Sequence, residues 1–138
     1  MQRSLDLARV LVVDDELSSR LTLQTILEAG GYRVDVAGSA DEAISKLDQG
    51  QYELVLSEAE MESPQAGMRV LSHARVMEYR PATALVTAYR EAKASRHRLG
   101  DEQQVSINME NVSALLARVA DLIGIRAWQR SAQRAAQA

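Results

Sequence analysis

The sequence predicts an α/β fold: a doubly wound, five-stranded parallel sheet of (βα)5 form with helices on both faces. Two observations predict it. Short apolar segments, typical of buried strands, alternate with longer segments in which apolar residues recur at helical spacing. Glycine or proline separates many of these segments, as at Gly30, Gly31, Gly50 and Pro81. Because strands joined through a helix run parallel, five such units give one open sheet with both faces covered.

The first two strand–helix units carry clear signals. Residues 9–13 form a continuous apolar run, and residues 17–29 follow with apolar side chains at helical spacing. Residues 32–36 alternate between apolar and polar, which predicts a second strand. Ser39, with Glu42 three residues later, has the form of a capping box and predicts that a second helix begins there.

The rest of the chain continues the alternation. Ligand sites in such sheets lie outside the carboxyl ends of the strands, so that edge is where we expect the function to reside. The expected elements are a strand at 52–57, a helix at about 68–79, a strand at 82–87, a short polar helix at about 91–98, a weak strand at 105–108 and a helix from about 111.

Three acids stand at the predicted carboxyl ends of two strands. Asp14 and Asp15 follow the strand at 9–13, and Glu58 follows the apolar strand at 52–57. Carboxylates that lie a few Å apart raise one another's pKa and favour protonation or the binding of a cation. The sequence therefore predicts an acidic pocket at this edge, formed by Asp14, Asp15 and Glu58, as a candidate site.

Composition excludes several classes of function. The chain has 138 residues, the length of a single domain, and contains no cysteine, which excludes a disulfide framework, a thiolate zinc site and cysteine nucleophiles. The net charge of -3 provides no general basic field, so direct binding of nucleic acid is not expected. The N-terminus lacks a signal peptide and the sequence lacks an apolar run of membrane-spanning length. We expect a cytoplasmic protein that does not bind membranes.

The strand-tip residues and their neighbours together resemble the receiver domain of bacterial two-component response regulators. The resemblance covers residues 8–126, with residues 1–7 as an N-terminal extension and 127–138 as a helical or disordered tail. It implies a flavodoxin-like sheet with strand order 2-1-3-4-5. The motifs that carry it are Val10-Leu11-Val12-Val13-Asp14-Asp15-Glu16, Gly31-Tyr32-Arg33-Val34, Tyr52-Glu53-Leu54-Val55-Leu56, Met61 with Gly67, and Leu85-Val86-Thr87-Ala88.

The resemblance also implies a chemistry, from which this chain departs. In typical receivers an aspartate accepts a phosphoryl group from phosphohistidine, while Mg²⁺, a lysine and a Ser/Thr hydroxyl stabilise the phosphoryl oxygens. Asp14, Asp15 and Thr87 match that pattern. Glu58 occupies the acceptor position, with its carboxylate about 1.5 Å farther from the backbone. A displacement near 1 Å can cost about 10²-fold in rate.

The lysine of that pattern is missing as well. Asn108 stands where the family has it. At 4 Å and an effective dielectric constant near 20, the lost charge is worth about 4 kcal/mol. A neutral hydrogen bond from asparagine returns roughly 1 kcal/mol.

Two further departures concern signalling. The aromatic residue that couples the site to a remote face in typical receivers is replaced by Val105, whose branched side chain has little rotamer freedom. Tyr89 is an alternative source of an aromatic ring. The loop after Glu58 is one residue longer than usual before its glycine, with Pro64 displaced.

We therefore expect a degenerate receiver of a phosphorelay system that acts through protein–protein interaction. The expected partner is a histidine kinase, an output protein or another receiver, and the expected homodimer face is the fourth helix, fifth strand and fifth helix. The alternative within the family is a working Mg²⁺-dependent receiver that uses Glu58 or a neighbouring acid such as Glu60. Arg90, Arg96 and Arg98 are candidates to replace the missing charge.

A metal-dependent phosphatase-like enzyme is the alternative from another class. His73 and His97 fall on predicted helices away from the strand tips, and no glycine-rich phosphate loop follows the first strand. We expect no enzymatic activity. The tail has two interpretations: a solvated helix, or a partner-binding or dimerising helix that uses Ile125, Trp128 and Ala132.

Overall fold

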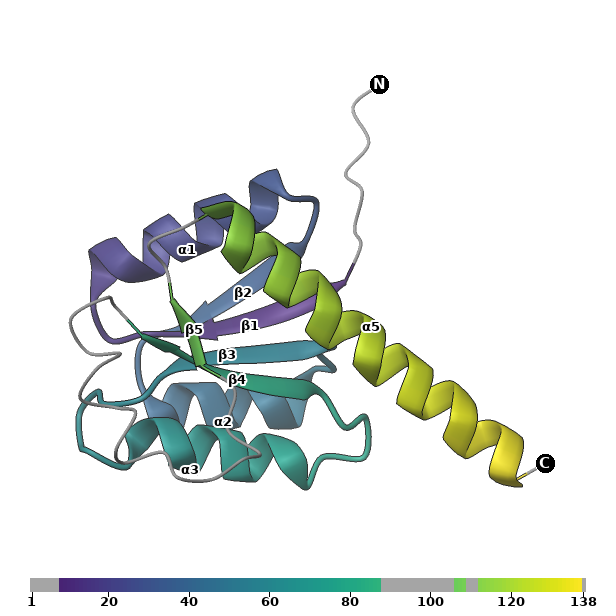
Figure 1. The fold of residues 1–138 in the computed structure, drawn as a ribbon. Helices are drawn as coiled ribbons and strands as arrows, with labels where there is room; N and C mark the ends of the chain where they lie inside the picture. Colours follow the sequence, from purple (N-terminus) through teal and green to yellow (C-terminus); the bar gives the residue numbers. More distant parts are fainter. Residues whose placement is uncertain (1–7, 88–105, 109–111, 138) are drawn as a thin grey trace.

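The computed structural model describes residues 8–87, 106–108 and 112–137. Within them, short strands alternate with helices along the chain (Figure 1). The elements are β1 (Arg9–Val13), α1 (Leu17–Ala29), β2 (Arg33–Ala37), α2 (Ala40–Gln49), β3 (Leu54–Glu58), α3 (Ala66–Arg75), β4 (Ala82–Thr87), β5 (Ser106–Asn108) and α5 (Val112–Gln137).

The strands form a single parallel sheet in the order β2-β1-β3-β4-β5. The predicted α/β class and the order of the first four strands are confirmed. β5 is described over Ser106–Asn108, and the expected first residue of the fifth strand, Val105, lies outside the described residues. The polar helix expected at 91–98 also lies outside them.

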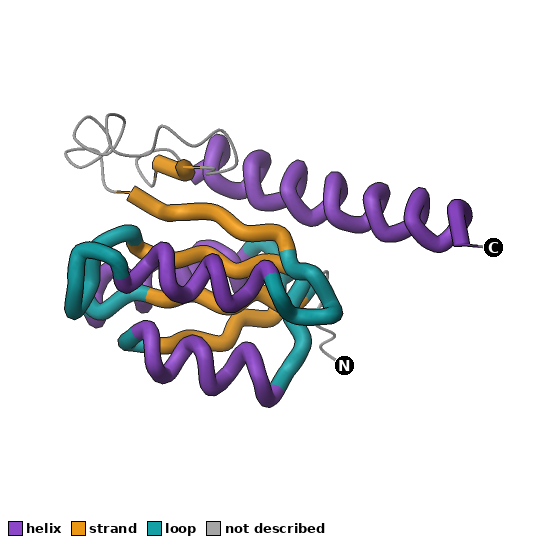
Figure 2. Tube along the Cα trace, turned by 90° about the horizontal axis from the view of Figure 1, so that it is seen from below, coloured by secondary structure: helices purple, strands orange, loops and turns teal. Residues whose placement is uncertain are grey.

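Helices cover both faces of the sheet (Figures 1 and 2), and the central strands β1 and β3 are almost completely buried. Successive side chains of a strand point to opposite faces. In β1, Val10 and Val12 therefore join the core beneath α1 and α5, while Leu11 and Val13 join the core beneath α2 and α3. This packing explains why β1 is an uninterrupted apolar run.

The third helix differs from its predicted extent of 68–79. α3 begins at Ala66 and ends at Arg75, and the following residues form a turn held by backbone bonds from Val76 to His73 and from Arg80 to Met77. Arg80 has a φ of 44°, in the left-handed region. Apolar spacing continues past the helix end because Tyr79 is buried, although it lies in the turn.

The fifth helix is longer than the sheet that it covers. α5 buries Leu115, Val119 and Leu122 against the sheet and then continues past it to Gln137 (Figure 1). The tail is therefore helical through that residue. None of the described helices is both long and apolar enough to span a membrane.

Candidate functional site at the carboxyl edge of the sheet

The strand register brings the predicted site positions to one edge. Val13 of β1 is the register partner of Ser57 of β3, so Asp14 and Glu58, the next residue of each strand, are neighbours across the sheet. Adjacent parallel strands lie about 4.8 Å apart. β4 also pairs with β5, and there Thr87 of β4 is the register partner of Asn108 of β5. The backbone therefore places residues 14, 58, 87 and 108 along one rim.

Asp14 is the buried acid of this rim, with 5% of its surface exposed. Its Oδ1 accepts a hydrogen bond of 2.9 Å from the backbone N–H of Glu16. Its own N–H donates to the carbonyl oxygen of Ala37 at 3.0 Å. Burial raises the pKa of Asp14 above its usual value, and the Glu16 N–H opposes that rise only in part. Asp14 is thus a desolvated carboxylate held by the turn that follows β1.

The three predicted acids are not arranged as a ready-made metal site. Asp15 is exposed, Glu58 is half-buried, and Asp14 is turned toward the Glu16 N–H. No group of three or more His, Asp or Glu side chains in the described residues is placed to hold a metal ion. The acidic pocket of Asp14, Asp15 and Glu58, with Mg²⁺ as its possible ligand, stays a prediction: residues 14 and 58 are neighbours across the sheet.

Acids around this edge are used to hold their own loops. Glu16 Oε1 accepts hydrogen bonds from Ser19 at 2.7 Å and Ser18 at 3.1 Å, and these bonds hold the pKa of Glu16 below its usual value. Glu62, in the loop after β3, accepts from the N–H of Ala40 at the start of α2 at 2.9 Å. These contacts fix the loops that surround the rim.

Arg20 is a residue of this edge that the sequence did not reveal. From α1, its Nη1 donates to the carbonyl oxygen of Asp14 at 2.8 Å, and the guanidinium lies beside Gly38, next to β2. Its positive charge acts to lower the pKa of Asp14, though less than burial raises it. A basic residue early in a helix that follows a strand-tip acid is the only signal that could have indicated it.

The structure explains why residue 67, at the end of the loop after Glu58, is glycine. Its N–H donates to the carbonyl oxygen of Ala59 at 3.0 Å. A Cβ at this position would clash with the carbonyl oxygen of Glu58 and would lie 2.6 Å from that of Ala59. The start of α3 therefore packs on the backbone that carries residue 58, and only glycine permits that approach.

The remaining candidates lie elsewhere. Glu60 is exposed. His73 lies on α3, where its Nε2 is 2.7 Å from Asp48 Oδ1 of α2, so it belongs to a contact between two helices. The described positions therefore add no histidine to the rim. The candidates Tyr89, Arg90, Arg96, His97, Arg98 and Val105 lie outside the described residues.

Comparison with protein families decides the relationship. Residues 10–107 match the model of the family described as the response regulator receiver domain. This stretch contains both neighbouring acid positions and the loop that packs on Gly67. The chain belongs to the response regulator receiver family.

Two curated relatives are transcriptional regulatory proteins. Over 84 residues this receiver is 34% identical to the transcriptional regulatory protein ResD of Bacillus subtilis, covering 61% of this chain and 35% of ResD. Over 80 residues it is 31% identical to the transcriptional regulatory protein ZraR of Klebsiella oxytoca, covering 58% of this chain and 18% of ZraR. The chain thus matches only a minor part of either relative.

A solved structure shows the same fold along almost the whole receiver chain. The crystal structure described as adenylate cyclase from Rhodopirellula baltica superposes with a TM-score of 0.78 at 19% identity, covering 94% of this chain and 96% of that chain. The likeness supports the fold. The sequence departures of this receiver, at residues 58 and 108, must be judged from their chemistry.

Proposed function

We propose that this receiver has lost, or nearly lost, aspartyl-phosphate chemistry and acts by binding a protein partner in a phosphorelay pathway. The observation that carries the proposal is the strand register, which puts Glu58 beside Asp14 and Asn108 beside Thr87. The acceptor carboxylate is displaced by one methylene, and the position of the family's lysine carries no charge. Phosphoryl transfer depends almost entirely on positioning and charge, so both changes oppose it.

Arg20, a described cation at the rim, does not replace that lysine. Arg20 directs its Nη1 to the carbonyl oxygen of Asp14 and lies beside Gly38, on the β2 side of β1. Glu58 is on the opposite side of β1, because the strand order is β2-β1-β3. A phosphoryl group on residue 58 would need its counter-charge from the β4–β5 side. Arg20 instead stabilises the turn after β1.

A working Mg²⁺-dependent receiver is the second candidate, and one observation favours it. Asp14 is buried and its pKa is raised by burial, so a divalent cation would relieve an unfavourable desolvated charge. Carboxylate oxygens are the ligands that Mg²⁺ prefers. The side chains of Asp14, Asp15 and Glu58 would have to rearrange to bind it, which is why we rank this function second.

Phosphorylation by a small donor separates the two functions. The chain is incubated with acetyl phosphate and Mg²⁺ and read by intact mass, beside the double variant Glu58→Asp/Asn108→Lys, which restores acceptor length and charge. We expect no phosphoryl adduct on the natural chain and a measurable adduct on the double variant. An adduct on the natural chain that disappears in Glu58→Gln, but persists in the control Glu60→Gln, would reverse the order of the two candidates.

The partner is a cytoplasmic protein in this proposal: a histidine kinase, an output protein or another receiver. Binding should not depend on phosphorylation, so a partner captured by the chain should be captured equally by Glu58→Gln. Loss of capture in that variant, or capture that requires acetyl phosphate, contradicts the proposal. We assign the chain no enzymatic activity, and turnover of a generic phosphate ester with Mg²⁺ or Mn²⁺ would overturn that assignment.

A further inference from the structure

The outward side of α5 carries a large apolar group beside an open position. Trp128 is 72% exposed. One helical turn earlier, Gly124 is exposed, and a Cβ built on it would meet no atom within 4 Å. Glycine inside an exposed helix lowers helix stability relative to alanine. No described contact within the chain requires glycine at this position. The space beside it could therefore hold a group from another molecule.

Gly124 and Trp128 belong to one continuous face. At helical spacing it lies opposite Leu115, Val119 and Leu122, which α5 buries against the sheet. Every residue of this face is exposed. We define the outer α5 face as Ala117, Asp121, Gly124, Trp128 and Ala135.

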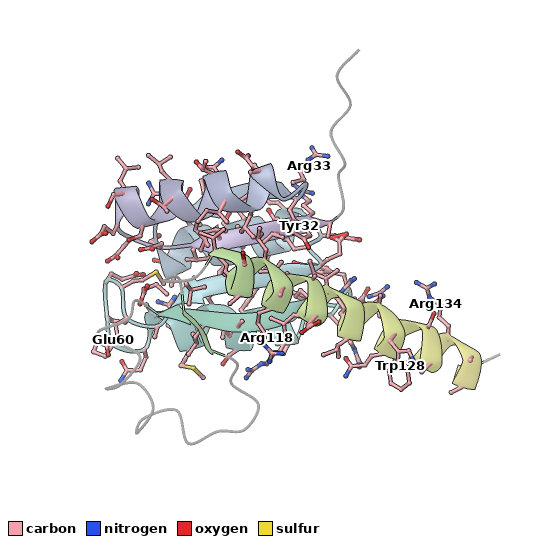
Figure 3. The ribbon with its side chains drawn as sticks, turned by 45° about the horizontal axis from the view of Figure 1, so that its top comes forward. Tyr32, Arg33, Glu60, Arg118, Trp128 and Arg134 are labelled. Atoms are coloured by element: carbon pink, nitrogen blue, oxygen red, sulfur yellow. The ribbon has the colours of Figure 1, made fainter. Side chains whose placement is uncertain are left out.

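The charges of α5 are distributed unevenly. It has one acidic residue, Asp121, and four basic residues, Arg118, Arg126, Arg130 and Arg134, three of which lie in its last part. Arg126 and Arg130 bind carbonyl oxygens of the turn after α3, so their guanidinium groups are held on the side facing the domain. Figure 3 shows Trp128 and Arg134 on the part of α5 that extends beyond the sheet, with their side chains leaving the helix in different directions.

We propose that the outer α5 face pairs with the same face of a second copy of this chain, in antiparallel orientation. A twofold axis near residue 126 brings Trp128 of each copy over Gly124 of the other. A large group and an open position one turn apart on the same face are self-complementary under that symmetry. Small residues at the other positions, such as Ala117 opposite Ala135 of the second copy, allow the helices to approach closely.

The open position at Gly124 selects the antiparallel orientation. In that orientation each Trp128 lies over Gly124 of the other copy, and the two helix dipoles oppose each other favourably. In a parallel pair Trp128 would face Trp128 and Gly124 would face Gly124, so the open positions would stay unfilled. Asp121 would also face Asp121, and these like charges would repel.

The size of the contact predicts a weak dimer. The 26 residues of α5 span about 39 Å. A tryptophan side chain contributes roughly 150–250 Å² of buried surface, and a standard interface buries about 1,600 Å² in total. Two such helices with mostly small residues reach only the lower end of that range. We expect a dissociation constant on the order of micromolar.

Trp128 is the only tryptophan, so its fluorescence reports this contact directly. The full chain is measured by sedimentation velocity and emission spectroscopy from about 0.1 to about 100 μM, a range that brackets micromolar affinity. Dimer formation and a blue shift of the emission should occur over the same concentrations. A monomer throughout overturns the proposal, and so does a dimer whose emission does not change, because its interface would lie elsewhere.

A matched pair of variants tests the open position. Gly124→Leu fills it with a good helix former, and should weaken the dimer by about tenfold or more, equivalent to 1.4 kcal/mol. Gln129→Leu adds the same side chain at an exposed position outside the outer α5 face and should leave the dissociation constant within about twofold. Equal effects of the two substitutions, or no effect of Gly124→Leu, would overturn the pairing. Circular dichroism confirms that both variants fold.

Engineered cysteines test the orientation, because the chain contains none of its own. Isotope-labelled Ala117→Cys is mixed with unlabelled Ala135→Cys under mild oxidation, so that each disulfide product has a distinct mass. Antiparallel pairing predicts mainly the mixed product. Products that join two copies of the same variant overturn the antiparallel orientation. Neither outcome depends on the chemistry of Glu58, so this test is independent of the proposed function.

Discussion

Asp14 shows how two adjacent acids of identical type acquire different roles. It is buried at the end of β1 and satisfied by the Glu16 N–H, whereas Asp15, the next residue, is exposed. The sequence indicates that both stand at a strand tip. It does not indicate which one is desolvated, because that depends on how the turn after β1 packs beside β2 and α1.

The burial of Asp14 predicts a pH-dependent effect of Asp14→Asn. Because its folded pKa is raised, ionised Asp14 lowers stability at neutral pH, and this penalty disappears as the pH falls through the folded pKa. Asparagine keeps the acceptor oxygen without the charge. We expect Asp14→Asn to raise the free energy of unfolding at pH 7, measured by urea denaturation with a chelator present, and the gain to shrink at acidic pH. A gain of equal size at both pH values would contradict this cause.

Two glycines predict opposite effects of the same substitution. Gly67→Ala places a methyl group against the backbone of Glu58 and Ala59 and should destabilise the fold by about 1–3 kcal/mol or more. Gly124→Ala places it in open space inside α5 and should stabilise the helix by roughly 0.5–1 kcal/mol. Thermal unfolding at sub-micromolar concentration measures both without interference from self-association. The same sign for both would show that backbone approach does not govern Gly67.

At the scale of elements, α5 is attached to the domain at two levels. Its first half packs by apolar side chains on the sheet, and its second half is held by hydrogen bonds to the turn after α3. Arg126 donates from Nε to the Arg80 carbonyl oxygen at 2.9 Å and from Nη2 to that of Tyr79 at 2.6 Å, and Arg130 Nη1 donates to Tyr79 at 2.7 Å. The left-handed backbone of Arg80 belongs to this turn.

Loss of these bonds should loosen the end of α5 without unfolding its beginning. In Arg126→Ala/Arg130→Ala we expect amide hydrogen exchange in residues 126–136 to accelerate by about tenfold or more, because charged hydrogen bonds contribute about 1.5–3 kcal/mol each. Exchange near Leu115 and Val119 should stay unchanged, since those residues are held by the core. Arg134→Ala, one turn farther on, is the control and should have little effect. Uniform acceleration along α5 would contradict the idea that these arginine bonds hold the end of the helix separately from its beginning.

At the scale of the whole molecule, the sequence predicts what is periodic and misses what is not. The strands, most helices and the position of the rim follow from apolar runs, alternation and parallel connections, which each segment carries locally, whereas the strand order was implied by the family resemblance. Arg20, Arg126 and Arg130 all donate hydrogen bonds from their side chains to backbone carbonyl oxygens. The bonds of Arg126 and Arg130 join residues 46 to 51 positions apart, so no local sequence pattern predicts them. The helix predicted through Tyr79 ends earlier, at Arg75. Tyr79 fits the apolar spacing of that helix because it is buried, although it lies in the following turn. The departures that we propose at residues 58 and 108 rest on the residues that the resemblance implies at those positions.

Tyr79 has a mechanical consequence for this molecule. Its hydroxyl donates to the carbonyl oxygen of Leu47 in α2 at 2.8 Å, and its own carbonyl oxygen accepts from Arg126 and Arg130 of α5. α2 and α5 lie on opposite faces of the sheet (Figure 1). One residue therefore links the two helical layers around the sheet's amino-terminal edge, through its side chain on one face and its backbone carbonyl on the other. A force applied to the projecting end of α5 would be transmitted through Tyr79 to α2. The two helices should therefore move together.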